Sequence, residues 1–171
     1  MIEQQGSTPP ATDPAPRAGH DTADGSGTAL AGPVRPFADI LAERAATPGR
    51  RKSQRTRLRL MSATAGLLRD RPVHALRVTD VARGAAVSPG TFYLYFPDKT
   101  EAAATTLDAF ARYLHERLDG AAAVESTLPG SVRATTLVYV SEFEQNPGLF
   151  RALMQMTGES ARFEAIYREL N

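Results

Sequence analysis

Aromatic side chains are concentrated in one short segment, residues 88–99. Phe92 and Phe96 lie four positions apart, so on a helix they share one face and are predicted to point inward. Tyr93 and Tyr95 must then project elsewhere. Two phenols are costly on a plain solvent face, but their hydroxyls can donate to phosphate oxygens. The spacing therefore favours contact with a nucleic-acid backbone over the alternative, in which both rings merely pack on a neighbouring helix.

The residues that begin and end this segment define a short helix. Ser88 can cap it because its hydroxyl accepts from an early backbone N–H, and Pro89 suits the first helical position because it has no N–H to leave unsatisfied. Pro97 ends it, so the predicted helix covers Pro89–Phe96.

Two helices are expected before this one. Apolar residues recur with helical spacing over residues 60–68, and Pro72 ends that helix. A shorter helix is predicted over Val78–Ala85, followed by a turn at Ala86 and Val87. Two short helices joined by a tight turn predict a helix-turn-helix, whose second helix enters the major groove of DNA.

The distribution of charge agrees with a local polyanion contact. Residues 50–100 hold 11 Lys and Arg against 3 Asp and Glu, whereas the flanking segments are both acidic and the whole chain has a net charge of +1. The basic lead-in at residues 50–59 could reach phosphates or an adjacent minor groove, although a basic block is often only a solvated surface.

The rest of the chain predicts an all-α protein with an irregular start. Residues 1–49 contain 7 Pro and 6 Gly and few large apolar residues, so we expect a disordered tail, with a marginal helix at Pro36–Ala46 as a short exception. Helices are expected after the helix-turn-helix at residues 98–118, 131–145, 149–156 and 159–170.

Several functional classes are disfavoured. There is no Cys, no apolar run long enough to span a membrane, and no secretory signal, so we expect a cytoplasmic protein without membrane contact. The residues His20, His74 and His115 share no common spacing, and no catalytic or metal-ligand constellation is visible. We expect neither an enzyme nor a cofactor or metal site.

Three sequence blocks carry a family resemblance: VTDVAR at 78–83, AAVS at 85–88 and GTFYLYFPDK at 90–99. Together they make residues 60–104 resemble the N-terminal domain of the TetR/AcrR family of bacterial regulators. The resemblance implies a helix-turn-helix domain at residues 50–100 and a helical regulatory and dimerisation domain at residues 101–171. It also implies the DNA-contacting positions, which with the basic lead-in are Arg51, Arg55, Arg83, Ser88, Gly90, Thr91, Tyr93, Leu94, Tyr95 and Lys99.

Within this set the resemblance distinguishes roles. Tyr93, Tyr95 and Lys99 match phosphate-clamping positions, and Gly90 allows close approach to the groove. Arg83 matches a position that reads a base or phosphate, and the alternative is a solvated or intramolecular charge. Leu94 could contact a thymine methyl group.

Three residues depart from the family pattern. Ala86 stands where the family commonly has Gly, so a left-handed conformation there would cost about 1 kcal/mol. Arg77 replaces the usual Ser or Thr cap and cannot accept a hydrogen bond. Leu94 replaces a residue that is often polar or basic, which puts base recognition in question more than DNA binding.

A weaker resemblance continues over residues 143–151, and it implies a C-terminal domain that dimerises and encloses a small-molecule effector. Candidate pocket residues are Phe110, Tyr113, Leu114, Tyr139, Phe143, Phe150, Met154 and Met156, with an ordinary bundle core as the alternative for each. Only 75 residues follow Phe96, fewer than the family usually has, so this domain is expected to be incomplete.

The resemblance as a whole implies a ligand-responsive repressor that binds double-stranded DNA at a palindromic operator as a homodimer. The alternative is a DNA-binding regulator without small-molecule control, either constitutive or governed by a protein partner.

Overall fold

The computed structural model describes residues 33–157, and every regular element in that range is helical. In chain order the described elements are α1 (Phe37–Ala46), α2 (Lys52–Leu68), the 3₁₀ turn η2 (Val73–Ala75), α3 (Val78–Gly84), α4 (Pro89–Tyr93), α5 (Lys99–Ala123), α6 (Leu128–Gln145) and α7 (Pro147–Thr157). The all-α prediction is confirmed for these residues.

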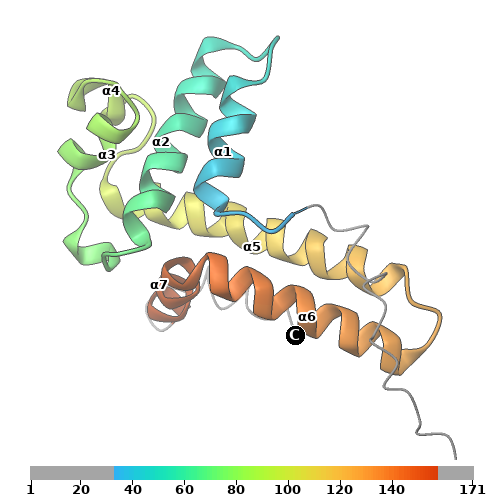
Figure 1. Cartoon of the computed structure of the whole chain (residues 1–171). Coiled ribbons are helices and arrows are strands. Elements are labelled where there is room, and N and C mark those ends of the chain that lie inside the picture. Colours follow the sequence, from blue (N-terminus) through green and yellow to red (C-terminus); the bar gives the residue numbers. More distant parts are fainter. Residues whose placement is uncertain (1–32, 158–171) are drawn as a thin grey trace, which may run out of the picture.

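The helices form two groups that share a core. Figure 1 shows α1 and α2 side by side and antiparallel, standing on the first half of α5, with α3 and α4 at one side of α2. The long helices α5 and α6 run antiparallel, and α7 returns to contact both α2 and α5. The core is therefore continuous from the helix-turn-helix to α7, and its largest fully buried side chains include Phe37, Phe92, Phe96 and Phe110.

Helix α1 confirms the helix expected at Pro36–Ala46, so the disordered tail predicted for residues 1–49 does not include these residues. Phe37, Leu41 and Ala45 fall on one face of α1 and are buried, and the first two belong to the hydrophobic core. Ser62 of α2 donates a 2.8 Å hydrogen bond to the carbonyl of Ala38. This segment has few apolar residues, but Phe37 and Leu41 are spaced to enter the core that α2 and α5 also line.

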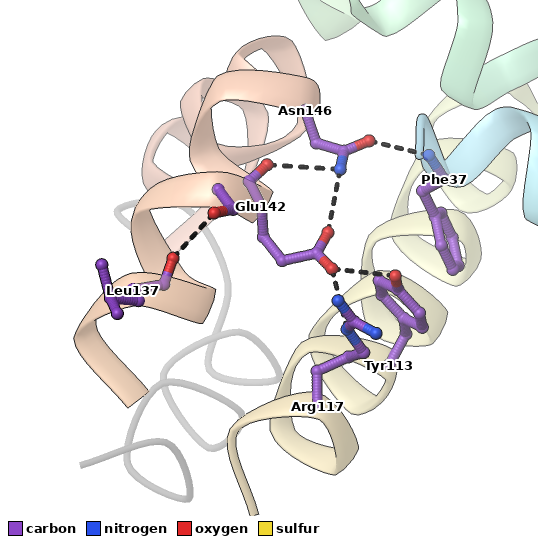
Figure 2. A network of polar contacts seen from close by, with 7 residues as sticks. Phe37, Tyr113, Arg117, Leu137, Glu142 and Asn146 are labelled. Carbon is purple, nitrogen blue, oxygen red and sulfur yellow. Dashed lines mark hydrogen bonds and ion pairs between the residues drawn. The ribbon is translucent and has the colours of Figure 1, made fainter. Parts of the chain in front are cut away.

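A buried polar network fastens the start of α1 to the end of α6. Asn146, the residue that follows α6, accepts a 2.8 Å hydrogen bond from the backbone N–H of Phe37 through its side-chain oxygen. Its amide nitrogen donates to the carboxylate of Glu142 at 3.2 Å. Figure 2 shows Tyr113 and Arg117 of α5 reaching the same carboxylate, at 2.9 and 3.0 Å.

The Glu142 carboxylate is fully buried, but it accepts hydrogen bonds and faces the Arg117 guanidinium, which offsets much of its desolvation. Burial, together with the hydrogen bond to Glu142 and the charge of that carboxylate, raises the pKa of Tyr113 to about 12. The phenol therefore stays protonated and remains a donor through the physiological range.

Several helix bounds differ from the prediction. Helix α4 ends at Tyr93, three residues earlier than predicted, and the chain continues to Phe96 in single hydrogen-bonded turns. Helix α5 extends to Ala123, beyond the predicted Leu118. Helix α6 starts at Leu128, earlier than the predicted Ser131, because Thr127 caps it. Pro129 fits the first turn because the N–H that it lacks would have no helical partner there. The helix predicted at residues 159–170 lies outside the described residues.

Helix α7 is held against the end of α2. A Cβ atom on Gly148 would overlap the backbone of Leu68 and Arg69, so only glycine permits this approach. Arg151 donates to the carbonyls of Leu68 and Arg69 at 3.3 and 3.4 Å, which places a cation at the C-terminal end of α2. These contacts give structural roles to two residues of the segment 143–151.

Candidate nucleic-acid interface

Helix α3 ends in a Schellman turn that aims the following helix. The N–H of Val87 donates to the carbonyl of Ala82 and the N–H of Ala86 donates to that of Arg83, both at 3.0 Å. Ala86 has φ +50°, so the left-handed conformation expected at this position is present in a residue other than glycine. Arg77, at the other end of α3, makes no side-chain cap, as its chemistry predicted.

The cap of α4 follows the local sequence signal. The Ser88 hydroxyl accepts from the N–H of Thr91 at 3.1 Å, and the two side-chain hydroxyls lie 2.9 Å apart. Pro89 occupies the first turn. Phe92 and Phe96 are fully buried, which fixes the inner face of α4 and leaves the opposite face for a partner.

The outer face of α4 and the turn after it is largely open. Tyr93 is 57% exposed and Leu94 is 82% exposed. Gly90 is exposed and Thr91 is half-buried, whereas Tyr95 packs partly against the core. Among the described residues, no group hydrogen-bonds the hydroxyl of Tyr93 or Tyr95, so both donors remain available.

A basic stripe on α2 leads to this face. Arg55 and Arg59 lie four residues apart and share one side of α2, and Arg51 immediately precedes the helix. Arg59 donates to the carbonyl of Ala86 at 3.4 Å, so the stripe meets the turn between α3 and α4. Arg57 stacks over the Phe96 ring at 5.2 Å and thus also bridges α2 to the α4 segment. Arg51 and Arg55 are exposed and, within the described part of the chain, form no ion pair.

The remaining two predicted contacts have partners inside the chain. Arg83 is exposed but forms a 3.2 Å ion pair with Asp80, which also pairs with Arg71 at 3.0 Å. The Lys99 ammonium donates to the carbonyls of His74 and Leu76, at 2.5 and 2.9 Å. The sequence analysis left an intramolecular charge open for Arg83, but it did not anticipate the contacts of Lys99.

Gly84 is a packing residue of the helix-turn-helix that the sequence analysis missed. A Cβ atom there would lie 3.0 Å from the Cβ of Ala63 on α2, so glycine lets α3 approach α2 closely. The sequence feature that could have indicated this is a glycine in the last turn of a predicted helix, since glycine inside a helix often permits close packing against a neighbour.

Known proteins are similar to this chain over the region that contains the helix-turn-helix. A family model described as bacterial regulatory proteins of the tetR family matches residues 60–111. Residues 60–111 are a TetR-family domain. The HTH-type transcriptional regulator EthR of Mycobacterium tuberculosis (strain ATCC 25618 / H37Rv) is 43% identical to this chain over 51 residues, and EthR of Mycobacterium bovis has the same identity. Each match covers 30% of this chain and 24% of the relative, so it concerns the TetR-family domain alone.

The candidate effector residues divide between the core and the surface. Phe110, Tyr113, Leu114, Phe150 and Met156 are buried in the core that the TetR-family domain shares with the helices after it, and the rings of Phe110 and Phe150 pack edge to face at 5.3 Å. Tyr139, Phe143 and Met154 are exposed on α6 and α7. A hollow of about 150 Å³ lies instead between the start of α1, the end of α2 and the junction of α6 and α7, lined by other residues that include Asp39, Gly66, Arg69 and Gln145.

Two other properties concern the described residues only. Residues 33–157 contain no group of three or more His, Asp or Glu side chains that could hold a metal ion. None of the helices in that range is long and apolar enough to cross a membrane.

Proposed function

We propose that this chain is a sequence-specific DNA-binding transcription regulator that inserts α4 into the major groove. The observation that carries the proposal is the arrangement of α4: its aromatic core face is locked by Phe92 and Phe96, while its opposite face presents free donors beside an exposed basic stripe. A helix held in this way can enter the groove without reorganising the fold.

The proposed contacts divide into two kinds. Tyr93 and Tyr95 donate to phosphates, and Arg51 and Arg55 add sequence-independent attraction along the flanking backbone. Ser88, Gly90, Thr91 and Leu94 lie at or near the groove side of α4, where a hydroxyl or an apolar side chain can meet base edges. Arg83 could exchange its ion pair with Asp80 for a base or a phosphate.

We further propose that the regulator acts as a homodimer on a palindromic operator. Helix α6 supports this proposal because six of its apolar side chains are exposed, and four of them, Leu128, Val132, Tyr139 and Phe143, share one face; the other two are Leu137 and Val140. Exposed apolar patches of this kind mark interaction surfaces. The exposed charges on α6 are Arg133 and Glu144, so net charge would not oppose contact between two copies.

Repression relieved by a small molecule is the proposed mode of control. A ligand that favours one position of α5 would change the spacing of two α4 helices in a dimer, because α5 directly follows the helix-turn-helix. The alternative, regulation without a small molecule, is favoured by the packing of Phe110, Tyr113 and Phe150 into the core. A thermal-shift screen separates the two, since reproducible stabilisation by a compound supports ligand control.

A direct test measures binding to a labelled DNA duplex of mixed sequence by fluorescence anisotropy. The double variant Arg51→Met and Arg55→Met should weaken binding at least about tenfold, because each lost phosphate contact removes counterion release. Arg133→Met on α6 is the matched control and should bind like the original chain. Equal affinity for the double variant and the original chain would contradict the proposed interface.

A further inference from the structure

Lys99 occupies a position in the fold that differs from that of the exposed cations. It is the first residue of α5, and its side chain is only partly exposed. Its ammonium donates to the carbonyl oxygens of His74 and Leu76, which belong to η2 and the residue that follows it. Two of its three N–H donors are therefore committed inside the chain.

These two hydrogen bonds join the residues that flank the helix-turn-helix on either side. Leu76 immediately precedes the start of α3 and Lys99 follows α4, and the two residues are 23 positions apart in sequence. The Leu76 side chain is buried in the core, so its carbonyl is a fixed anchor. The Lys99 side chain thus joins the two ends of the α3–α4 unit.

The carbonyls gain from this arrangement as well. Within the described residues, neither the His74 nor the Leu76 carbonyl accepts a backbone hydrogen bond outside the regular helices. The lysine supplies charge-assisted hydrogen bonds to both, which are stronger than neutral ones. At the same end of α5, Asp98 accepts from the N–H of Glu101 at 2.8 Å and fixes the first turn from which Lys99 extends.

We infer that Lys99 is a positioning residue, which closes the helix-turn-helix by pinning α5 to the η2 segment, and is not a phosphate clamp. The inference rests on the proposed function for its effect on DNA, but the tie itself is a property of the free protein. Through this tie the orientation of α4 is set relative to α5, the helix that leads to the C-terminal part. A displacement of α5 would then be transmitted to α4 through Lys99.

The test compares Lys99→Met with Arg55→Met, which removes an exposed cation from the proposed interface. Hydrogen exchange is measured on the full chain without DNA. The Lys99 variant should lose protection roughly tenfold at residues 73–80, as expected for losing charge-assisted hydrogen bonds, while the Arg55 variant should not. Unchanged exchange in the Lys99 variant would overturn the inference.

The second arm measures affinity for a mixed-sequence duplex between about 50 and 200 mM salt. Arg55→Met should reduce the slope of log affinity against log salt by about one, the signature of a lost phosphate contact. Lys99→Met should weaken binding by a similar factor at every salt concentration and leave the slope nearly unchanged. A slope reduced by about one in the Lys99 variant would assign it to a phosphate. If the original chain fails to bind DNA, the proposed function is wrong. The hydrogen-exchange measurement still shows whether Lys99 holds α5 against the η2 segment.

Discussion

The side-chain oxygen of Asn146 accepts a 2.8 Å hydrogen bond from the backbone N–H of Phe37, a residue 109 positions earlier in the chain. An orphan N–H at the start of α1 is thus satisfied by Asn146, the residue that follows α6. Because Pro36 offers no side-chain cap, Asn146 performs the capping role from a distant part of the chain.

Asn146→Ala should therefore destabilise the chain by about 1–3 kcal/mol, because it leaves a buried N–H without a partner and removes a donor to Glu142. Urea denaturation followed by circular dichroism measures the loss. Gln145→Ala, at the exposed neighbouring position, is the control and should change stability by less than about 0.5 kcal/mol. Equal stability of the two variants would show that the α1 tie contributes nothing.

Ala86→Gly should stabilise the chain by about 0.5–1 kcal/mol. At φ +50° an alanine pays a steric cost that glycine avoids, and this cost exceeds the extra backbone entropy that glycine loses on folding. The melting temperature checks the sign. Ala85→Gly, at a buried position with φ −84°, should lower it, and a lower melting temperature for Ala86→Gly as well would refute the strain argument.

The two glycines near the turn should respond differently to a methyl group. Gly84→Ala should cost about 1 kcal/mol, since overpacking against Ala63 outweighs the better helix propensity of alanine. Gly90→Ala meets only the Ser88 hydroxyl oxygen at 3.8 Å and should fold normally. Its added methyl instead faces the proposed groove, so we expect DNA affinity to fall about tenfold. Melting temperatures and fluorescence anisotropy of both variants test this. A Gly90→Ala variant that binds DNA normally would show that α4 does not approach the DNA closely at this position.

Stability should depend on the ionisation of Tyr113 at alkaline pH. Its pKa is raised to about 12 from the ordinary value of 10, chiefly by burial, so the folded state prefers the protonated phenol. The resulting stabilisation, roughly 2 kcal/mol, is fully present below pH 10 and is lost as the pH rises from about 10 to 12.

Tyr113→Phe isolates this contribution from the other groups that titrate in the same range. The difference in unfolding free energy between the original chain and the variant should be constant up to about pH 9 and should shrink above pH 10. A difference that does not change with pH would mean that the phenol keeps its ordinary pKa.

Features set by neighbouring residues could be predicted from the sequence. The Ser88 cap, the buried pair Phe92 and Phe96, and the strained turn at Ala86 all depend on local spacing, and the structure has each of them. The exposed stripe that contains Arg51 and Arg55 likewise follows from composition.

Features that depend on distant residues could not be predicted in this way. A helix was expected at Pro36–Ala46, but its burial in the core and the hydrogen bond of Phe37 to Asn146 after α6 depend on residues far away in the sequence. The need for glycine at position 84 depends on how closely α3 approaches Ala63, and the environment of Lys99 depends on the path of η2. These relations arise only when separate helices pack together.

Selection of bound duplexes from a random DNA library tests the central claim most directly. A sequence-specific regulator should enrich one short motif, and a homodimer should enrich it as an inverted repeat whose half-sites lie about one helical turn, or a multiple of it, apart. The Tyr93→Phe variant should bind the enriched duplex more weakly than the original chain, since it lacks the donor to phosphate. Recovery of duplexes without a shared motif, at an affinity equal to that of mixed-sequence DNA, would contradict the account.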